Sequence, residues 1–195
     1  MVDPYKITWT DKLLAATVLK LFPARVTPNQ ITIFRFITIP FIAYLLSSGE
    51  YRWATVLFFI SAFSDALDGA LARTTNRITE WGTAYDPVAD KLLIGLAVFL
   101  ILPHYLGPLI AFMIILMEMI LIGMGYYFRN SRDKQFQANW WGKLKMLFES
   151  VGVMLVLLYS LFPVGFFLIS AEVILYAAVG LAFVSLINYA KVRNI

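Results

Sequence analysis

The chain has 195 residues, of which 61% are hydrophobic and only 14% are charged, and it contains no cysteine. Soluble domains are about half apolar and about a quarter charged, so this composition excludes an ordinary soluble domain and favours an integral membrane protein. The lack of cysteine excludes disulfides, thiolate metal sites and a cysteine nucleophile. The formal net charge is only +4, and we expect no nucleic-acid partner.

The first segment, residues 1–28, is predicted to be cytoplasmic and interfacial. Between residues 11 and 22, apolar side chains such as Leu14, Val18 and Leu21 share one helical face, while Asp11 and Lys20 lie elsewhere. This pattern predicts an amphipathic helix that lies in the membrane interface and ends before residue 23, which is proline.

Residues 29–195 are predicted to form one transmembrane domain. A membrane-spanning helix needs about 20 apolar residues, so a chain of this length can hold six such helices with short loops. The apolar stretches are residues 31–47, 53–71, 82–102, 106–128, 144–162 and 164–190. The sequence therefore predicts an all-α integral membrane protein with six transmembrane helices, preceded by the interfacial helix.

Positive charge is distributed unequally between the two sides of this predicted bundle. The side that holds loops 1–2, 3–4 and 5–6 has only Arg52, and all other lysines and arginines near helix ends lie on the opposite side. Because positively charged loops remain in the cytoplasm, both termini and loops 2–3 and 4–5 are predicted to be cytoplasmic. This arrangement predicts a multi-pass protein of the cell (inner) membrane.

Four aspartates lie at the cytoplasmic ends of the second and third predicted helices. Asp65 and Asp68 are three residues apart, and Asp86 and Asp90 are four apart, so each pair shares one helical face. Carboxylates near hydrocarbon normally pair, bind metal or line a wet cavity. Four mutually repelling carboxylates favour a divalent ion, and oxygen ligands favour Mg²⁺, Mn²⁺ or Ca²⁺ over zinc. Mg²⁺ bound in this way commonly also contacts a substrate phosphate.

Small residues and one arginine accompany the four acids. Gly69, Ala72 and Gly82 would let a bulky ligand approach the helix backbone, although such residues also serve simple helix packing in membranes. Arg73 could neutralise a diphosphate or could be an ordinary cytoplasmic anchor. In order, the spaced residues are Asp65, Asp68, Gly69, Ala72, Arg73, Gly82, Asp86 and Asp90.

This spacing resembles the signature of the CDP-alcohol phosphotransferase family at every fixed position. The resemblance implies a homodimeric enzyme that transfers a phosphatidyl group from CDP-diacylglycerol to a hydroxyl acceptor and releases CMP, in phospholipid biosynthesis. It further implies that Asp65, Asp68 and Asp86 bind two divalent ions, Mg²⁺ or Mn²⁺, and that Asp90 is both a metal ligand and the base that deprotonates the acceptor. A divalent-cation transporter is the alternative from a different functional class.

The same resemblance assigns further contacts to the CDP-lipid and the acceptor. The residues expected to bind the CDP-lipid are Asn29, Thr32, Gly69, Ala72, Arg73, Thr79 and Gly82. Residues 29–35 with Pro40, together with residues 86–91, resemble the phosphatidylglycerophosphate synthase branch, whose acceptor is glycerol 3-phosphate. A phosphate-bearing acceptor requires cations, and the candidates are Lys91, Arg129, Lys143 and Lys145.

Other acceptors remain open from the sequence. Met117 and Met146 replace an arginine and a threonine that are usual in this branch, and residues 86–91 also suit cardiolipin synthases that use phosphatidylglycerol. Residues 27–29 resemble enzymes with inositol-phosphate acceptors. Of the remaining acids, Glu118 is predicted to be paired or to face a polar cavity, and Glu149 is predicted to pair with Lys145, four residues earlier.

Overall fold

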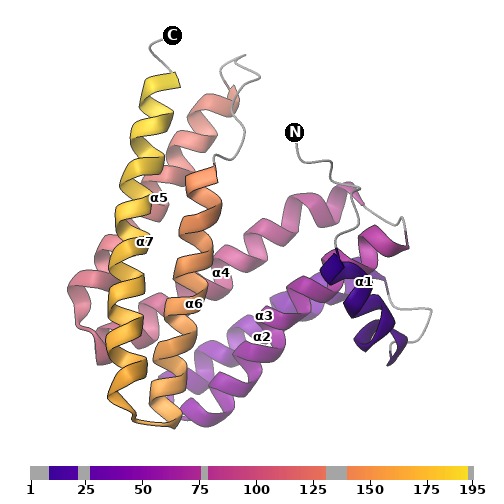
Figure 1. The fold of residues 1–195 in the computed structure, drawn as a ribbon, viewed down its shortest axis with the longest axis horizontal. Helices are drawn as coiled ribbons and strands as arrows, with labels where there is room; N and C mark the ends of the chain where they lie inside the picture. Colours follow the sequence, from indigo (N-terminus) through magenta and orange to yellow (C-terminus); the bar gives the residue numbers. More distant parts are fainter. Residues whose placement is uncertain (1–8, 22–26, 76–78, 131–139, 193–195) are drawn as a thin grey trace. The chain divides into compact units, whose positions relative to one another are not determined.

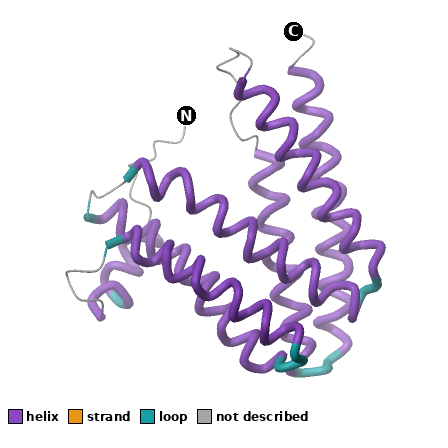
Figure 2. The backbone as a smooth tube through the Cα atoms, turned by 180° about the vertical axis from the view of Figure 1, so that it is seen from behind, coloured by secondary structure: helices purple, strands orange, loops and turns teal. Residues whose placement is uncertain are grey.

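The computed structural model describes residues 9–21, 27–75, 79–130 and 140–192, and throughout these ranges every regular element is helical (Figures 1 and 2). The elements are α1 (Trp9–Ala16), the 3₁₀ helix η1 (Val18–Leu21), α2 (Pro28–Ser47), α3 (Tyr51–Thr74), α4 (Glu80–Tyr105), α5 (Pro108–Asn130), α6 (Trp140–Leu161) and α7 (Gly165–Val192). Six of them, α2 to α7, contain a stretch long and apolar enough to cross a membrane. The prediction of an all-helical, multi-pass membrane protein is confirmed.

The N-terminal helix is shorter than the sequence predicts. Its α-helical part ends at Ala16, and η1 follows after a turn at Thr17. The Thr17 hydroxyl donates a hydrogen bond of 2.7 Å to the carbonyl of Leu13, and such side-chain bonds to the preceding turn compete with regular helix geometry. Its position in a membrane interface remains a prediction, and the expected end at residues 22 and 23 lies outside the described residues.

The chain divides into two compact units, residues 1–93 and 94–195. In the first unit α1 packs on α3, and α2 and α3 form an antiparallel pair that lies side by side in Figures 1 and 2. The α2 helix begins with Pro28 after Thr27, whose backbone N–H donates to the side-chain Oε1 of Gln30 at 3.0 Å. The pair reverses at Gly49, whose φ of +79° is a conformation that glycine adopts without strain.

The α2–α3 interface is apolar near the Gly49 turn and polar further along. Ile42 and Phe58 are almost fully buried. The hydroxyls of Thr38 on α2 and Ser61 on α3 are 2.9 Å apart, and both residues are buried. Continuing away from the turn, this polar part of the interface leads to the acids of α3.

In the second unit α6 and α7 pack along one another, and α5 also contacts α7. Val153 and Leu157 of α6 are fully buried, as are Leu175 and Ala178 of α7. The two helices come close because Gly152 has no side chain: a Cβ atom there would lie 2.5 Å from Cγ of Leu175. Small residues at such positions are a common device for close helix packing in membranes.

Candidate active site

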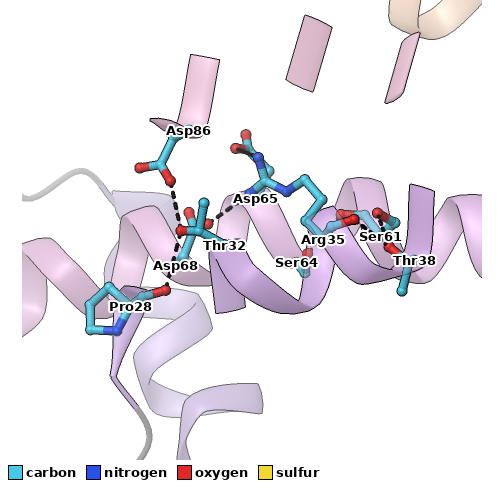
Figure 3. A network of polar contacts seen from close by, with 9 residues as sticks. All are labelled: Pro28, Thr32, Arg35, Thr38, Ser61, Ser64, Asp65, Asp68 and Asp86. Carbon is cyan, nitrogen blue, oxygen red and sulfur yellow. Dashed lines mark hydrogen bonds and ion pairs between the residues drawn. The ribbon is translucent and has the colours of Figure 1, made fainter. Parts of the chain in front are cut away.

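The acids of α3 meet an arginine from α2. Arg35 is fully buried, and its Nη1 and Nη2 each lie 2.7 Å from one carboxylate oxygen, of Asp65 and of Asp68 respectively (Figure 3). Asp68 is almost completely buried, with 4% of its side chain exposed, whereas 47% of the Asp65 side chain is exposed. The guanidinium thus joins two acids that differ strongly in their access to solvent.

The spacing of residues along both helices explains this contact. Ile31, Arg35, Thr38 and Ile42 are all buried, and their separations of four, three and four residues place them on one face of α2. Arg35 therefore stands in the stripe of α2 that packs on α3. A charge in that position is tolerated only when opposite charges offset it, and the α3 carboxylates do so.

Asp86, from α4, is held by the preceding turn of α2. The Thr32 hydroxyl donates to Oδ1 of Asp86 at 2.7 Å and lies 3.4 Å from the carbonyl oxygen of Pro28 (Figure 3). Thr32 precedes Arg35 by three residues, so the contacts with Asp86 and with the α3 acids lie on one face of α2. The structure therefore brings three of the four predicted acids together around one face of α2.

Three of the residues expected at the CDP-lipid form a second group beside Asp86. The Thr79 hydroxyl donates to Oδ1 of Asn29 at 2.7 Å, and the backbone N–H of Gly82 donates to the Thr79 hydroxyl at 3.0 Å. A Cβ on Gly82 would lie 3.1 Å from the Thr79 hydroxyl and 3.5 Å from a carboxylate oxygen of Asp86. The absence of a side chain at residue 82 therefore lets the start of α4 lie against Asn29 and Thr79.

Arg73 has a partner that the sequence does not reveal. Its Nε and Nη2 donate to the two carboxylate oxygens of Asp11 at 2.9 and 2.8 Å, and Asp11 is buried. The pair fastens α1 to α3. Gly69 leaves room for it, because a Cβ there would lie 3.1 Å from Nη2 of Arg73. Ala72, on the same helix, is partly buried.

Asp90 and Lys91 complete the predicted site residues of the first unit. Asp90 follows Asp86 by one turn of α4, which places it on the same helical face. Both side chains are partly buried.

The carboxylates have the chemistry of a divalent-metal site, although no three acidic or histidine side chains of the described chain converge as a ready-made coordination shell. Asp65 and Asp68 contact the guanidinium of Arg35, and Asp86 contacts Thr32 one turn earlier on α2. Their oxygen donors suit Mg²⁺ or Mn²⁺, which commonly complete their coordination with water and substrate phosphate. The residues present therefore fit the metal that the sequence predicts.

A separate ion cluster lies in the second unit. Lys145 of α6 is buried and pairs with Glu118 of α5 and, at 2.9 Å, with Glu149 one turn along α6. The predicted pairing of Lys145 with Glu149 is confirmed, and Glu118 is paired as expected. Of the other candidate acceptor cations, Lys143 is exposed, and the side chain of Arg129 lies outside the described residues.

Two site contacts could not be assigned from the sequence, those of Arg35 and of Asp11. For Arg35 a signal was present, because a charged residue among apolar ones in a membrane helix commonly has a functional partner. Asp11 gave no comparable signal, since acids are ordinary at the start of a helix.

Comparison with known proteins identifies the family of the chain. Residues 25–184 match the family model of CDP-alcohol phosphatidyltransferase. A CDP-diacylglycerol–glycerol-3-phosphate 3-phosphatidyltransferase of Haemophilus influenzae is 33% identical over 175 residues, covering 86% of this chain and 92% of that protein. The proteins of the same name from Escherichia coli K12 and Salmonella choleraesuis are 32% identical, covering 65% of this chain and 73% of each relative. The chain, with its acids arranged around Arg35, belongs to the CDP-alcohol phosphatidyltransferase family of enzymes.

Proposed function

We propose that the chain transfers a phosphatidyl group from CDP-diacylglycerol to glycerol 3-phosphate, giving phosphatidylglycerophosphate and CMP. The observation that carries this proposal is the gathering of the motif acids Asp65, Asp68 and Asp86 around α2 in a chain of this family. The relatives at 32–33% identity, which are named for the glycerol 3-phosphate reaction, support this choice of acceptor.

In this proposal the acids hold the metal that the reaction needs. Asp65, Asp68, Asp86 and Asp90 would hold two divalent ions, Mg²⁺ or Mn²⁺, which would offset the charge of the CDP diphosphate and of the departing CMP. The group formed by Asn29, Thr79 and Gly82 lies beside Asp86, where it would contact the nucleotide end of the lipid. The remaining residues assigned to the CDP-lipid are Thr32, Gly69, Ala72 and Arg73.

The chemical step is a displacement at phosphorus. The acceptor hydroxyl oxygen attacks the phosphorus that bears the diacylglycerol, and the bond from that phosphorus to the bridging oxygen of CMP breaks. Asp90 takes the hydroxyl proton. An aspartate normally titrates near 4, so it is a weak base towards an alcohol. The step is therefore expected to depend on a good leaving group and on an acceptor held in line.

The phosphate of glycerol 3-phosphate requires cations on the acceptor side. We assign Lys143, which is exposed, together with Lys91 and Arg129 to this role. Lys145 is already paired with Glu118 and Glu149, so it would bind the acceptor phosphate while these ion pairs are also present. That pairing favours a second candidate acceptor, phosphatidylglycerol, whose hydroxyl headgroup needs less positive charge. Inositol-phosphate acceptors are a further alternative, and the acceptor assay below includes them.

The assay supplies purified protein with CDP-diacylglycerol, Mg²⁺ and each acceptor in turn, and it measures CMP and the lipid product. We expect phosphatidylglycerophosphate from glycerol 3-phosphate, and no CMP release after chelation of the metal. Asp68→Asn should lose both metal-dependent CDP-lipid binding and turnover, whereas Asp90→Asn should lose turnover and keep much of the binding.

Three outcomes would contradict parts of this proposal. Cardiolipin formed from phosphatidylglycerol, with no product from glycerol 3-phosphate, would overturn the acceptor. An active Asp90→Asn variant would remove Asp90 as the base. Metal transport without metal-dependent release of CMP would favour the divalent-cation carrier instead.

We further propose that residues 29–195 form the transmembrane domain of a homodimer in the cell (inner) membrane, with residues 1–28 and the active site on the cytoplasmic face. The distribution of lysine and arginine supports this orientation. In this cysteine-free chain, single cysteines at residues 77 and 131 should react only from the cytoplasm, and cysteines at Gly49 and His104 only from outside. The reverse labelling pattern would overturn the orientation.

A further inference from the structure

We infer that Arg35 is a positioning residue for the metal-binding carboxylates of α3. Its guanidinium contacts Oδ1 of Asp65 and Oδ2 of Asp68, both at 2.7 Å, which leaves the second oxygen of each carboxylate outside these contacts. Residues that hold a ligand through its other atoms commonly determine how well that ligand binds metal. This inference rests on the proposed function, in which Asp65 and Asp68 bind divalent ions.

The burial of Arg35 argues against a role in stability alone. The residue is fully buried, and neither its Nε nor its Nη1 has a hydrogen-bond partner among the residues that the structure describes, the contact of Nη1 with Asp65 being an ion pair. Taking a guanidinium out of water and leaving two of its nitrogens without a hydrogen-bond partner is unfavourable, and buried ion pairs are often no more stabilising than apolar residues of similar size. The location of Arg35 is better explained if the guanidinium orients the carboxylates of Asp65 and Asp68.

A second residue of α2, Thr32, contacts the third acid, Asp86, in a similar way. Thr32 and Arg35 are three residues apart and so lie on one helical face. Thr32 holds one oxygen of Asp86 at 2.7 Å, as Arg35 holds one oxygen each of Asp65 and Asp68 (Figure 3). One face of α2 therefore contacts acids from both α3 and α4.

Charge and position predict opposite effects when Arg35 is changed. A nearby cation repels a divalent ion, so charge alone predicts that removing Arg35 strengthens metal binding. Loss of position predicts weaker binding. Arg35→Lys separates the two, because lysine keeps the positive charge as a point charge and lacks the planar fork that grips two carboxylates at once.

The experiment titrates Mn²⁺ into the purified full-length protein and follows free Mn²⁺ by electron paramagnetic resonance. For Arg35→Lys we expect Mn²⁺ affinity to fall about 10- to 100-fold, the usual effect of losing a residue that orients a metal ligand. The Mn²⁺ concentration needed for half-maximal turnover should rise in parallel, with kcat largely recovered at saturating Mn²⁺. Arg35→Lys binding Mn²⁺ as the wild type does would overturn the inference.

Thr38→Val is the matched control. Thr38 lies one turn beyond Arg35. Its hydroxyl donates to the backbone carbonyl of Arg35 at 2.8 Å and contacts Ser61 across the same helix pair, without touching an acid or the guanidinium. This variant should perturb α2–α3 packing and keep wild-type Mn²⁺ affinity. If it weakens Mn²⁺ binding as much as Arg35→Lys does, the effect belongs to helix packing and the inference is withdrawn.

Two further variants keep the outcomes separate. If Arg35→Lys does not fold, Arg35→Gln replaces it: weaker Mn²⁺ binding supports positioning, and equal or tighter binding overturns it. If neither variant folds even with Mn²⁺ present, Arg35 is a structural ion-pair partner and the inference fails. Asp68→Asn tests the proposed function itself. If this variant binds Mn²⁺ as the wild type does, the proposed metal site is wrong. If Asp68→Asn loses Mn²⁺ binding while Arg35→Lys keeps wild-type Mn²⁺ binding, only the inference about Arg35 is wrong.

Discussion

Replacing Lys145 by methionine tests whether the ion cluster of the second unit serves stability or acceptor binding. Lys145 is buried between Glu118 of α5 and Glu149 of α6, so it joins two membrane-spanning helices. Methionine approximates the length and apolar stem of lysine and removes the charge. The variant would remove the cation that lies between the two carboxylates.

The expected cost follows from the exposure of the two acids. Removing one partner of a buried ion pair typically costs about 3–5 kcal/mol, because the remaining charge is left without compensation. Glu149 has only 6% of its side chain exposed, whereas Glu118 has 23% exposed and retains more access to water. We therefore expect a loss near the lower end, about 3 kcal/mol, which is about two orders of magnitude in the unfolding equilibrium constant.

The assay is reversible unfolding in mixed micelles, with Lys143→Met as the matched control. Lys143 is exposed, so its replacement should change the free energy of unfolding by no more than about 0.5 kcal/mol. Combining Lys145→Met with Glu118→Gln and Glu149→Gln should restore most of the stability, because no uncompensated charge is then left.

The outcome that would refute this reasoning is Lys145→Met being as stable as Lys143→Met. Kinetics then add a second distinction. If a stable Lys145→Met variant raised KM for glycerol 3-phosphate and left kcat unchanged, Lys145 would be an acceptor-binding residue after all.

Two further predictions concern helix packing in each unit. Gly152→Ala should destabilise the α6–α7 pair by about 1–3 kcal/mol, because its Cβ would lie 2.5 Å from Cγ of Leu175, while Gly180→Ala, with no atom within 4 Å, should not. Equal stability of the two variants in micelle unfolding would contradict this packing. Asp11→Asn should weaken the contact with Arg73 and speed amide hydrogen exchange across α1 while α2 exchanges as before. Unchanged exchange in α1 would show that the ion pair does not hold it.

The membrane helices could be predicted closely because their signal is local. Six apolar stretches of about 20 residues correspond to α2 through α7, and the structure extends most of them by two or three residues at an end. One stretch, predicted as residues 53–71, is the helix Tyr51–Thr74. Polar residues at helix ends can continue the backbone hydrogen bonding outside the hydrocarbon, which hydropathy does not register. The end of the α-helix at Ala16 was not predictable from hydropathy either, because it coincides with a turn at Thr17 that hydropathy does not register.

The site shows where local spacing stops being informative. Separations of three and four residues correctly predicted that Asp65 and Asp68 share a face, since that depends on one helix alone. Which residue of another helix meets that face depends on how both helices rotate about their axes, and neither composition nor spacing determines this rotation. The buried stripe of Ile31, Arg35 and Ile42 supplies the missing orientation, because the face that buries isoleucine must also carry the arginine into the helix pair. Arg35 therefore meets the acids as a consequence of the burial of Ile31 and Ile42 on the same face of α2.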